Sequence, residues 1–431
     1  MKVLFVHNNF PAQFRHLARL LAKDPANEVR AIGAEGAAAP RGVSLHRYSF
    51  QPVQSPETHA FARRFDLECR RAEQALYVAS MLSANGFRPD VIVAHGGWGE
   101  AMPLRAVWPE ARIIHYCEYF YRAQHSDVNF DPEFPGFGVD GLVGLNARNA
   151  TNLLALADAD LAIAPTNWQK STFPPEFAHK IHVVHEGVDT ALVAPDAEAV
   201  CRLENGITVT RADEVVTFVA RNLEPLRGYH VFMRALPALM KARPMARILI
   251  VGGFGVSYGQ RPPPGKTWHQ IFFDEVAGEI DLSRVHFLGP LAYEAYLDVL
   301  KVSSAHVYLT YPFVLSWSCL EAMATGCVLV ASDTQPVREV VETGVNGVLV
   351  PFHQPDRLAE AVAEVLADRA RFAPLGIAAR QTAVERFDTR TVCLPEMMRI
   401  LRIEPGAPAL APASAPAGQG ACVEPGAWPL G

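Results

Sequence analysis

The sequence lacks the features that mark several protein classes. Its seven cysteines are scattered and form neither CxxC pairs nor zinc-ligand spacings, so we expect reduced thiols and no structural zinc. No apolar run approaches the roughly 20 residues that a membrane-spanning helix needs. The opening stretch, MKVLFVHNNF, turns polar after six residues, which predicts a buried strand and not a signal peptide. These absences favour a cytoplasmic protein.

An excess of positive charge is also missing. The chain holds 39 basic and 45 acidic residues, which offers no general attraction to nucleic acid or to anionic lipid. We therefore expect no nucleic-acid partner, and any anionic ligand must be held by a local group of charges. The cluster RRFDLECRRAEQ at 63–74 is best explained as a solvent-facing helix surface. The alternative is peripheral contact with the inner face of a membrane, which would deliver a lipid-linked acceptor.

What the chain does have is a regular alternation of short apolar runs and longer helical patterns. Half of its 431 residues are apolar, and a chain of this length suggests two domains. Continuous apolar strands between helices predict parallel sheets covered on both faces. The predicted strands are 3–6, 91–94, 113–116, 161–164, 181–184, 215–220, 248–251, 285–288, 306–309, 328–331 and 347–350. A polar stretch at about 187–214 divides them, so we predict two doubly wound α/β domains, 1–190 and 191–388.

The stretch VVTFVARNLEPLRGYHVFMRALP follows the first strand of the second domain. Arg221 leaves the strand, and Arg227 stands beside Gly228 where a helix begins. A helix start offers unpaired N–H groups and a positive dipole end, so two guanidinium groups beside it would clamp a diphosphate. The alternative is that each arginine pairs with a nearby carboxylate such as Glu224. The position of both arginines at one strand–helix junction favours the phosphate site.

The stretch YPFVLSWSCLEAMATG at 311–326 predicts a second such junction. Ser316 or Ser318 can cap the helix, and the backbone amides at 315–318 form another end that favours anions. Glu321 follows about one turn later, where its carboxylate can accept two hydrogen bonds from a sugar diol. The pattern S-x-x-E beginning at Ser318 also fits a capping box. Spacing alone does not decide between these two roles.

These segments resemble a known family. RNLEPLRG is similar to the R-x5-K-G phosphate clamp, and SWSCLEAMATGCVLVASD to the end of the E-x7-E region, of retaining glycosyltransferases of family 4 (group 1). KIHVVHEGVD at 180–189 and VETGVNGVLV at 341–350 are also similar to family segments. The resemblance covers about residues 1–403. It implies the GT-B fold, an α/β architecture of two Rossmann-like domains facing across a cleft, with a C-terminal helix at 389–403 packed back on the first. The Pro-, Ala- and Gly-rich stretch 404–431 is predicted to be disordered.

The activity that the resemblance implies is transfer of a sugar, with retention, from a nucleotide-diphosphate sugar to a glycan, lipid-linked or small-molecule acceptor, as in polysaccharide biosynthesis. Arg221 and Arg227 would hold the diphosphate, and Glu321 would hold the ribose hydroxyls. Further contacts to the nucleotide would come from GGFG at 252–255 and HFLGPLAYEAY at 286–296. The positions concerned are Gly253, Gly289 and Leu291.

The sequence departs from the family pattern at Phe313, which stands eight residues before Glu321, where relatives have a glutamate that contacts the donor sugar. A phenylalanine cannot hydrogen-bond a hydroxyl group. Recognition of the sugar would then fall to Ser316, to the backbone near Val314 and Leu315, or to the first domain.

A second departure follows the first strand, where HNNFPAQFRHLA replaces a glycine-rich loop. Asn9 and Gln13 would supply polar contacts on the acceptor side. The alternative is that Asn9 caps a helix before Pro11. His95, in VIVAHGGWGE, is another acceptor-side candidate, although its neighbouring glycines also fit a loop that needs positive φ.

Two first-domain residues, His115 and Glu118 in ARIIHYCEYFY, are candidates to face the donor as catalytic groups. Glu118 would be a polar contact or acceptor base, because a carboxylate between aromatic residues is costly to bury without a role. The alternatives are an ion pair between Glu118 and Arg122, and a buried core imidazole for His115. The sequence does not settle which residue faces the donor.

No cofactor and no metal are expected. Guanidinium groups and helix ends can stabilise a leaving diphosphate without a cation. The D-x-D string 158–160 lies in LADADLAIAP, just before a strand, and the end of a helix explains it best. Two other functions stay open: a nucleotide-sugar-binding protein with little turnover, and a sugar-nucleotide epimerase, which would need a further acid pair.

Overall fold

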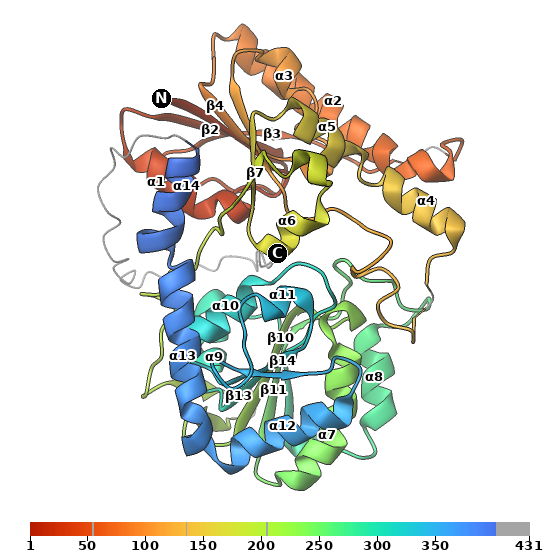
Figure 1. The fold of residues 1–431 in the computed structure, drawn as a ribbon, viewed down its shortest axis with the longest axis vertical. Helices are drawn as coiled ribbons and strands as arrows, with labels where there is room; N and C mark the ends of the chain where they lie inside the picture. Colours follow the sequence, from red (N-terminus) through yellow and green to blue (C-terminus); the bar gives the residue numbers. More distant parts are fainter. Residues whose placement is uncertain (54–55, 135, 204–205, 402–431) are drawn as a thin grey trace. The chain divides into compact units, whose positions relative to one another are not determined.

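Buried parallel strands organise the chain into two separate sheets. The computed structural model describes residues 1–53, 56–134, 136–203 and 206–401. Unit 1 consists of residues 1–187 together with 389–401, and unit 2 of residues 188–388. The predicted disordered tail, 404–431, lies outside the described residues. Each unit is built from one sheet with helices on both faces (Figure 1).

The sheet of unit 1 is parallel throughout, with the order β3-β2-β1-β4-β5-β6-β7. Its strands are β1 (Lys2–Val6), β2 (Glu28–Ala34), β3 (Ser44–Tyr48), β4 (Val91–His95), β5 (Arg112–Tyr116), β6 (Leu161–Ala164) and β7 (Ile181–Val183). The α-helices are α1 (Arg15–Lys23), α2 (Arg63–Ala84), α3 (Leu104–Val107), α4 (Val139–Ala147), α5 (Ala150–Asp158), α6 (Asn167–Thr172) and α14 (Leu394–Ile400). Residues of α1 and α14 complete the core on one face, and residues of α2, α3 and α5 complete it on the other. Because both faces are covered, the central strands are apolar throughout.

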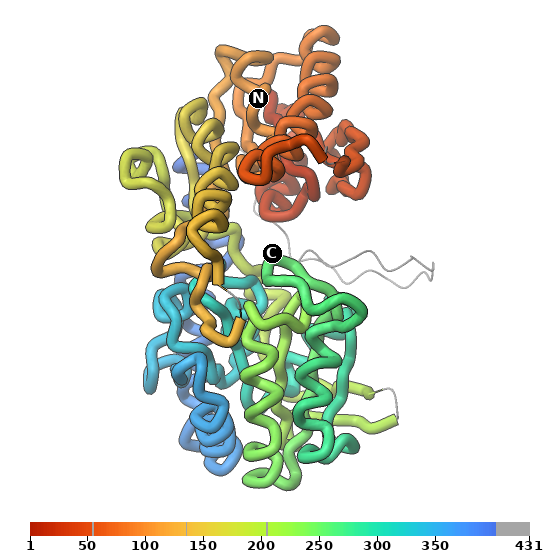
Figure 2. Tube along the Cα trace, turned by 90° about the vertical axis from the view of Figure 1, so that its right-hand side faces the viewer, coloured from red at the N-terminus to blue at the C-terminus, as the bar shows by residue number. Residues whose placement is uncertain are grey.

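The sheet of unit 2 is also parallel, with the order β12-β11-β10-β13-β14-β15. Its strands are β10 (Val215–Asn222), β11 (Arg247–Gly253), β12 (Val285–Gly289), β13 (Ala305–Tyr308), β14 (Leu329–Ser332) and β15 (Val348–Val350). The α-helices are α7 (Tyr229–Ala242), α8 (Trp268–Val276), α9 (Tyr293–Lys301), α10 (Trp317–Ala324), α11 (Gln335–Arg338), α12 (Pro355–Ala367) and α13 (Arg369–Phe387). An antiparallel hairpin, β8 (Val200–Arg202) and β9 (Thr208–Thr210), lies at the margin of the unit (Figure 2).

The predicted fold class is confirmed: every predicted strand is present within one or two residues at each end. Two predictions differ from the structure. β2 and β3 were not predicted, because charged residues in EVRAIGA and SLHRY interrupt the apolar runs on which the strand prediction relied. The stretch 187–214, expected to be irregular, contains the β8–β9 hairpin. Helix α2 begins at Arg63, after a single 3₁₀ turn at Ala60–Ala62.

The chain passes from unit 1 to unit 2 after Gly187 and returns after Asp388. Gly187 has a φ of +85°, and a Cβ atom there would lie 2.7 Å from the Cα atom of Thr389, so the outgoing and returning segments approach closely only with glycine. The returning segment ends in α14, whose apolar side chains belong to the core of unit 1. Within the described residues no helix combines the length and the apolar character that crossing a membrane requires.

Candidate functional site

The strand–helix junction after β10 holds Arg227 against the loop that follows β13. A 3₁₀ turn, Pro225–Arg227, ends at Gly228, whose φ is +68° and where an added Cβ atom would lie 2.4 Å from the Cβ atom of Leu309. Only glycine permits this approach. The Arg227 side chain is 7% exposed, and its Nη1 donates to Thr310 Oγ1 at 2.9 Å and to the carbonyl of Val314 at 3.1 Å. The two junctions singled out in the sequence are therefore in direct contact.

Glu224 is engaged elsewhere, so the carboxylate-pairing alternative does not describe Arg227. The Glu224 carboxylate accepts hydrogen bonds from the backbone N–H groups of Ser257 at 3.2 Å and Gly259 at 3.1 Å. Burial raises the pKa of Glu224, an effect opposed by these backbone donors and by the charge of Arg227. Its role is to fix the loop after β11. Arg221 is exposed near the end of β10, at the same edge of the sheet.

Phe313 is a packed side chain in this region. It is 2% exposed, its ring centroid lies 5.1 Å from that of Tyr258, and the guanidinium carbon of Arg227 lies 5.9 Å from it. Val314 and Leu315 are buried beside it. The Phe313 ring thus forms an apolar wall next to a cation, an arrangement that cation–π attraction favours.

Ser316 is the N-cap residue of α10, but its side chain does not bond to the backbone amides of the helix. Its Oγ donates to the hydroxyl of Tyr308 at 3.1 Å and lies 2.8 Å from Ser318 Oγ. The backbone N–H of Ser316 also donates to Tyr308, at 3.0 Å. The capping box beginning at Ser318 is wrong, because α10 begins two residues before the position that this motif requires.

Glu321 lies in the second turn of α10 and is 5% exposed. Its two carboxylate oxygens each accept a hydrogen bond from a tyrosine on α9, Oε1 from Tyr293 at 2.7 Å and Oε2 from Tyr296 at 2.8 Å. An ionised carboxylate has about four acceptor positions, so these bonds orient Glu321 and still leave it able to accept from a diol. Sequence reasoning missed both tyrosines, although they lie in the segment HFLGPLAYEAY that it singled out.

The remaining predicted contacts of unit 2 lie at the same edge. Gly253 ends β11 and Gly289 ends β12, next to the exits of β10 and β13 in the sheet. A Cβ atom on Gly253 would lie 2.7 Å from Asn222 Oδ1, whereas Gly289 has a φ of +62° and faces open space. Leu291 is partly buried and packs against the core. Arg221, Arg227, Glu321 and these three positions therefore gather at the carboxyl edge of one sheet, where α/β proteins bind ligands.

Three predicted residues of unit 1 also meet, at the carboxyl edge of its sheet. His95 Nε2 lies 3.2 Å from Glu118 Oε2, and Gln13 Nε2 donates to Glu118 Oε1 at 3.2 Å. Glu118 is 17% exposed, and the alternative ion pair with Arg122 is wrong, since Arg122 donates to the carbonyl of Ser171. Glu118 is thus held by two side chains from separate elements, the end of β4 and the 3₁₀ turn Ala12–Phe14.

His7 joins this group and was missed in the sequence, where the neighbouring asparagines drew attention. Its ring centroid lies 4.9 Å from that of His95, and its Nδ1 accepts the backbone N–H of Asn9 at 2.9 Å. Burial, followed by the charge of His95, holds the pKa of His7 well below its usual value. Asn9 itself is exposed and caps no helix, because α1 begins at Arg15, so the capping alternative is wrong.

His115 is separated from Glu118 and lies in the core. It is 1% exposed, and a Cβ atom on Gly96 would lie 1.5 Å from its Cε1 atom, so the glycine leaves room for the ring. Burial, followed by the charge of His95, lowers the pKa of His115 to about 3, which keeps the ring neutral. The ring is thus a core imidazole, although neither of its nitrogens has a hydrogen-bond partner among the described residues, so it is not the satisfied imidazole that the alternative assumed. Gly99 has a φ of +100°, in agreement with the alternative that a glycine is needed there for the turn.

The D-x-D string proves to be the end of a helix. Asp158 is the last residue of α5, and Asp160 Oδ2 accepts from the backbone N–H of Ile113 at 2.8 Å and from Arg105 at 2.7 Å. These two donors and the charge of Arg105 lower the pKa of Asp160 against the opposing effect of burial. Asp160 thus anchors the segment that follows α5 to β5 and to Arg105.

Family models match both units. A glycosyl transferase family 4 group model matches residues 25–193, and a glycosyl transferases group 1 model matches residues 213–368. The chain belongs to the glycosyltransferases of family 4. D-inositol 3-phosphate glycosyltransferases are among the relatives of this glycosyltransferase. That of Nocardia farcinica is 31% identical over 46% of this chain and 43% of its own, and that of Rhodococcus jostii is 27% identical over 55% and 51%. The match thus spans about half the length of these relatives.

Solved structures show the same GT-B fold. Sucrose-phosphate synthase from Thermosynechococcus elongatus has a TM-score of 0.68 and 19% identity, covering 93% of this glycosyltransferase and 98% of the synthase. HepE from Anabaena, solved in complex with UDP and glucose, has a TM-score of 0.62 and 20% identity, covering 93% and 99%. At these identities the likeness shows the fold alone, so the chemistry has to be argued from the residues of this chain.

Proposed function

We propose that the chain is a retaining glycosyltransferase that moves a sugar from a nucleotide-diphosphate sugar to a hydroxyl group of a carbohydrate or lipid-linked acceptor. The observation that carries this proposal is the position of Arg227. Its guanidinium is buried and fixed by Thr310 and Val314, in the loop that leads to α10. A fixed cation between two strand–helix junctions suits a diphosphate better than a structural ion pair, because its hydrogen-bond partners are neutral.

In this proposal unit 2 holds the donor. Arg227 and the exposed Arg221 bind the diphosphate, and they stabilise the negative charge that develops on it as the bond between the anomeric carbon and the phosphate oxygen breaks. Glu321 accepts hydrogen bonds from the ribose hydroxyls, in an orientation set by Tyr293 and Tyr296. Because the guanidinium of Arg227 is already fixed, little reorganisation accompanies the charge transfer.

Unit 1 would hold the acceptor. Glu118 is the one carboxylate in the described group with His95 and Gln13, and its partial exposure leaves it accessible to a ligand. The acceptor oxygen forms the new bond to the anomeric carbon, and its proton passes to Glu118. His95 and Gln13 are positioning residues for that carboxylate. His115 has no direct role in this scheme, since its ring is buried in the core.

The nature of the donor is the first thing to test. HepE was solved with UDP and glucose and with UDP-glucose, so UDP sugars are the first candidates to test.

We propose that catalysis needs no metal and no cofactor, and that the enzyme works in the cytoplasm. The experiment is a thermal-shift screen of UDP, GDP and ADP sugars. Each hit is then assayed for transfer, with NMR detection of the anomeric configuration, in the presence and absence of EDTA.

An inverted product, or activity lost with EDTA and restored by Mn²⁺, would contradict the corresponding part of this proposal. If no nucleotide sugar shifts the melting temperature or is consumed, the proposal as a whole is wrong.

A second candidate function is favoured by Phe313, which fills the place of a glutamate that contacts the donor sugar in relatives. A protein that binds a nucleotide sugar with little turnover would show calorimetric binding of UDP-glucose without hydrolysis or transfer. The variant Phe313→Glu separates the two candidates. It should raise turnover if only the missing carboxylate limits catalysis. A folded variant with no gain would mean that the apolar wall is part of a working sugar pocket.

A further inference from the structure

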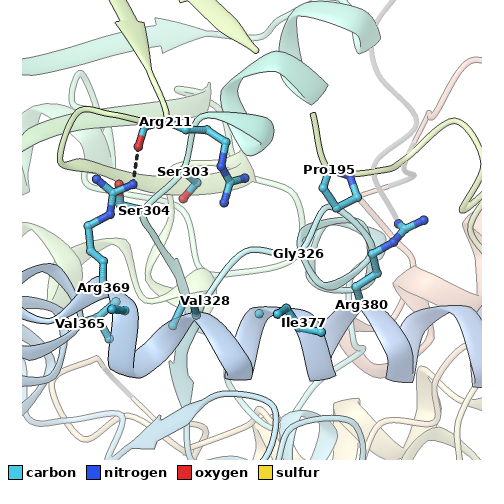
Figure 3. A pocket seen from close by; sticks show the side chains of 13 residues that line it. Pro195, Arg211, Ser303, Ser304, Gly326, Val328, Val365, Arg369, Ile377 and Arg380 are labelled. Carbon is cyan, nitrogen blue, oxygen red and sulfur yellow. Dashed lines mark hydrogen bonds between the residues drawn. The ribbon is translucent and has the colours of Figure 1, made fainter. Parts of the chain in front are cut away.

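A pocket of unit 2 lies at the opposite edge of the sheet from Arg227. It has a volume of about 490 Å³ and opens between the start of β13, the start of β14 and one face of α13 (Figure 3). Ser303 and Ser304 precede β13, and Val328 precedes β14, so these residues mark the amino edge of the sheet. The candidate donor residues follow the carboxyl ends of the strands. The two sites are thus separated by the length of the strands.

Three half-buried arginines line this pocket, and they come from separate segments. Arg211 follows β9, whereas Arg369 and Arg380 lie three turns apart on α13. Figure 3 shows the three guanidinium groups around the pocket, with Arg369 bonded to the backbone carbonyl of Arg211. No acidic residue is among the lining residues. The pocket is therefore strongly cationic.

The partners of these arginines within the described part of the chain are neutral carbonyl groups. Arg211 donates to the carbonyl of Lys301 at 3.1 Å, and Arg369 donates to the carbonyls of residues 211–213. Arg380 donates to the carbonyls of Thr190, Val193 and Ala324. Each guanidinium has five N–H donors, and these bonds hold the groups in place without neutralising their charge.

Several other arginines of unit 2 have carboxylate partners. Five of them form ion pairs with carboxylates, namely Arg234–Glu275, Arg243–Glu214, Arg284–Asp281, Arg338–Asp333 and Arg357–Glu360. Partly burying a cation without an anionic partner is costly. Three such cations around one pocket indicate that the compensating charge comes from a ligand.

The floor of the pocket is apolar. Ala373, Ile377 and Val328 line it, and α13 approaches closely because Gly376 has no side chain: a Cβ atom there would lie 2.5 Å from the carbonyl oxygen of Gly326. Apolar walls with a few polar anchors are typical of small-molecule sites. A bare inorganic ion would leave this floor uncovered, whereas a molecule with an anionic group and an apolar portion would satisfy both features.

We propose that this pocket binds a small organic phosphate monoester, with the phosphate among Arg211, Arg369 and Arg380 and an apolar group on the face of α13. Arginine is suited to this task because its planar fork of donors matches the geometry of phosphate oxygens. The site is distinct from the proposed donor site, and the proposal does not depend on the activity of the enzyme.

The test measures binding by calorimetry, with phenyl phosphate as the probe. Inorganic phosphate and phenol report the charged and the apolar half of the probe separately. Phenyl phosphate should bind at least about tenfold more tightly than either half alone, because only the intact probe makes both sets of contacts. Equal binding of phenol and phenyl phosphate, or no detectable binding of phenyl phosphate at millimolar concentration, overturns the proposal.

Matched variants locate the binding. Ala373 is exposed on α13, so Ala373→Glu and Ala373→Gln place side chains of equal size at the pocket, of which only one repels an anion. Ala373→Glu should bind phenyl phosphate about tenfold more weakly than Ala373→Gln. Arg211→Gln should weaken binding similarly, whereas Arg357→Gln, on the exposed face of α12, should not. Melting temperatures of all variants check that each is folded.

The variant Arg227→Gln tests whether phenyl phosphate binds at the donor edge instead of in this pocket. It should leave the affinity for phenyl phosphate unchanged. Loss of binding in Arg227→Gln with unchanged affinity in Ala373→Glu would place the phosphate at the donor edge and overturn the proposal.

Discussion

The carboxyl edges of the two sheets have the same strand order but gather different charged groups. In unit 1, the carboxylate of Glu118 is held by the ring of His95 and the amide of Gln13. In unit 2, equivalent strand exits deliver guanidinium groups, with Arg227 fixed by neutral oxygens. The sheet sets where side chains gather, and the residues at the strand ends set which part of a ligand they suit. Fixed guanidinium groups suit a diphosphate, and a carboxylate held by polar side chains suits a hydroxyl group.

The largest expected effect comes from the cationic edge. Arg227→Ala should lower kcat/KM for transfer about 10²- to 10³-fold, because one fixed donor to developing charge is removed. It should weaken UDP binding and leave uridine binding unchanged, as measured by calorimetry. Arg338→Ala, which removes an exposed arginine paired with Asp333, is the control. Equal losses for UDP and uridine would show that Arg227 does not contact the diphosphate.

Glu118→Gln tests the other edge. The variant keeps the shape of the side chain and removes the charge, so we expect transfer to fall about 10²-fold, the usual size of a lost acid–base contribution. UDP binding should not change, because Glu118 belongs to unit 1. Glu110→Gln, at an exposed position of the same unit, is the control. A variant with full activity would remove Glu118 from the proposed mechanism.

Acid should destabilise both units through buried histidines, and one in each unit gives a measurable test. Burial lowers the pKa of His115 in unit 1 and of His306 in unit 2 to about 3. Between about pH 6.5 and pH 3 the unfolded chain binds a proton at each site and the folded chain does not, so stability falls as pH falls. Each histidine should contribute about 1.4 kcal/mol per pH unit in this window, or roughly 2 kcal/mol by pH 5.

Urea unfolding between pH 7 and pH 5 measures this effect. His115→Leu and His306→Leu should each show a shallower dependence on pH, and His59→Leu, at an exposed position, should keep the slope of the unaltered protein. Unchanged slopes in the two buried variants would mean that neither ring stays neutral in the folded protein.

The smallest expected effect concerns the two tyrosines that hold Glu321. Tyr296→Phe should lower the free energy of unfolding by about 1.5 kcal/mol, because a buried carboxylate oxygen loses its donor. Tyr293→Phe should cost less, since Tyr293 is partly exposed and water can replace its hydroxyl. Both variants should weaken UDP binding if Glu321 holds the ribose. A larger loss of stability in Tyr293→Phe would reverse the assigned order.

The fold was predictable because the central strands are continuous apolar runs, and this pattern depends only on local sequence. β3 escaped prediction because it is an edge strand whose exposed residues break the pattern. Arg227 and Glu321 were identified because glycine and serine mark the helix starts beside them. The partners of Glu321, Tyr293 and Tyr296, were not identified, and neither was His7 beside His95 in unit 1. These residues reach their neighbours through the fold, and nothing in their sequence neighbourhood distinguishes them from core residues.

The route of the chain has a consequence for the order in which the molecule folds. Most of unit 1 is translated before unit 2, yet its core includes Leu394, Met397 and Leu401, which are translated after all of unit 2. Unit 1 can therefore complete its core only after unit 2 has been translated. A polypeptide that ended at residue 388 would contain the whole of unit 2 but would lack α14. The apolar surface of unit 1 that α14 covers would then be exposed, and exposed apolar surface promotes aggregation.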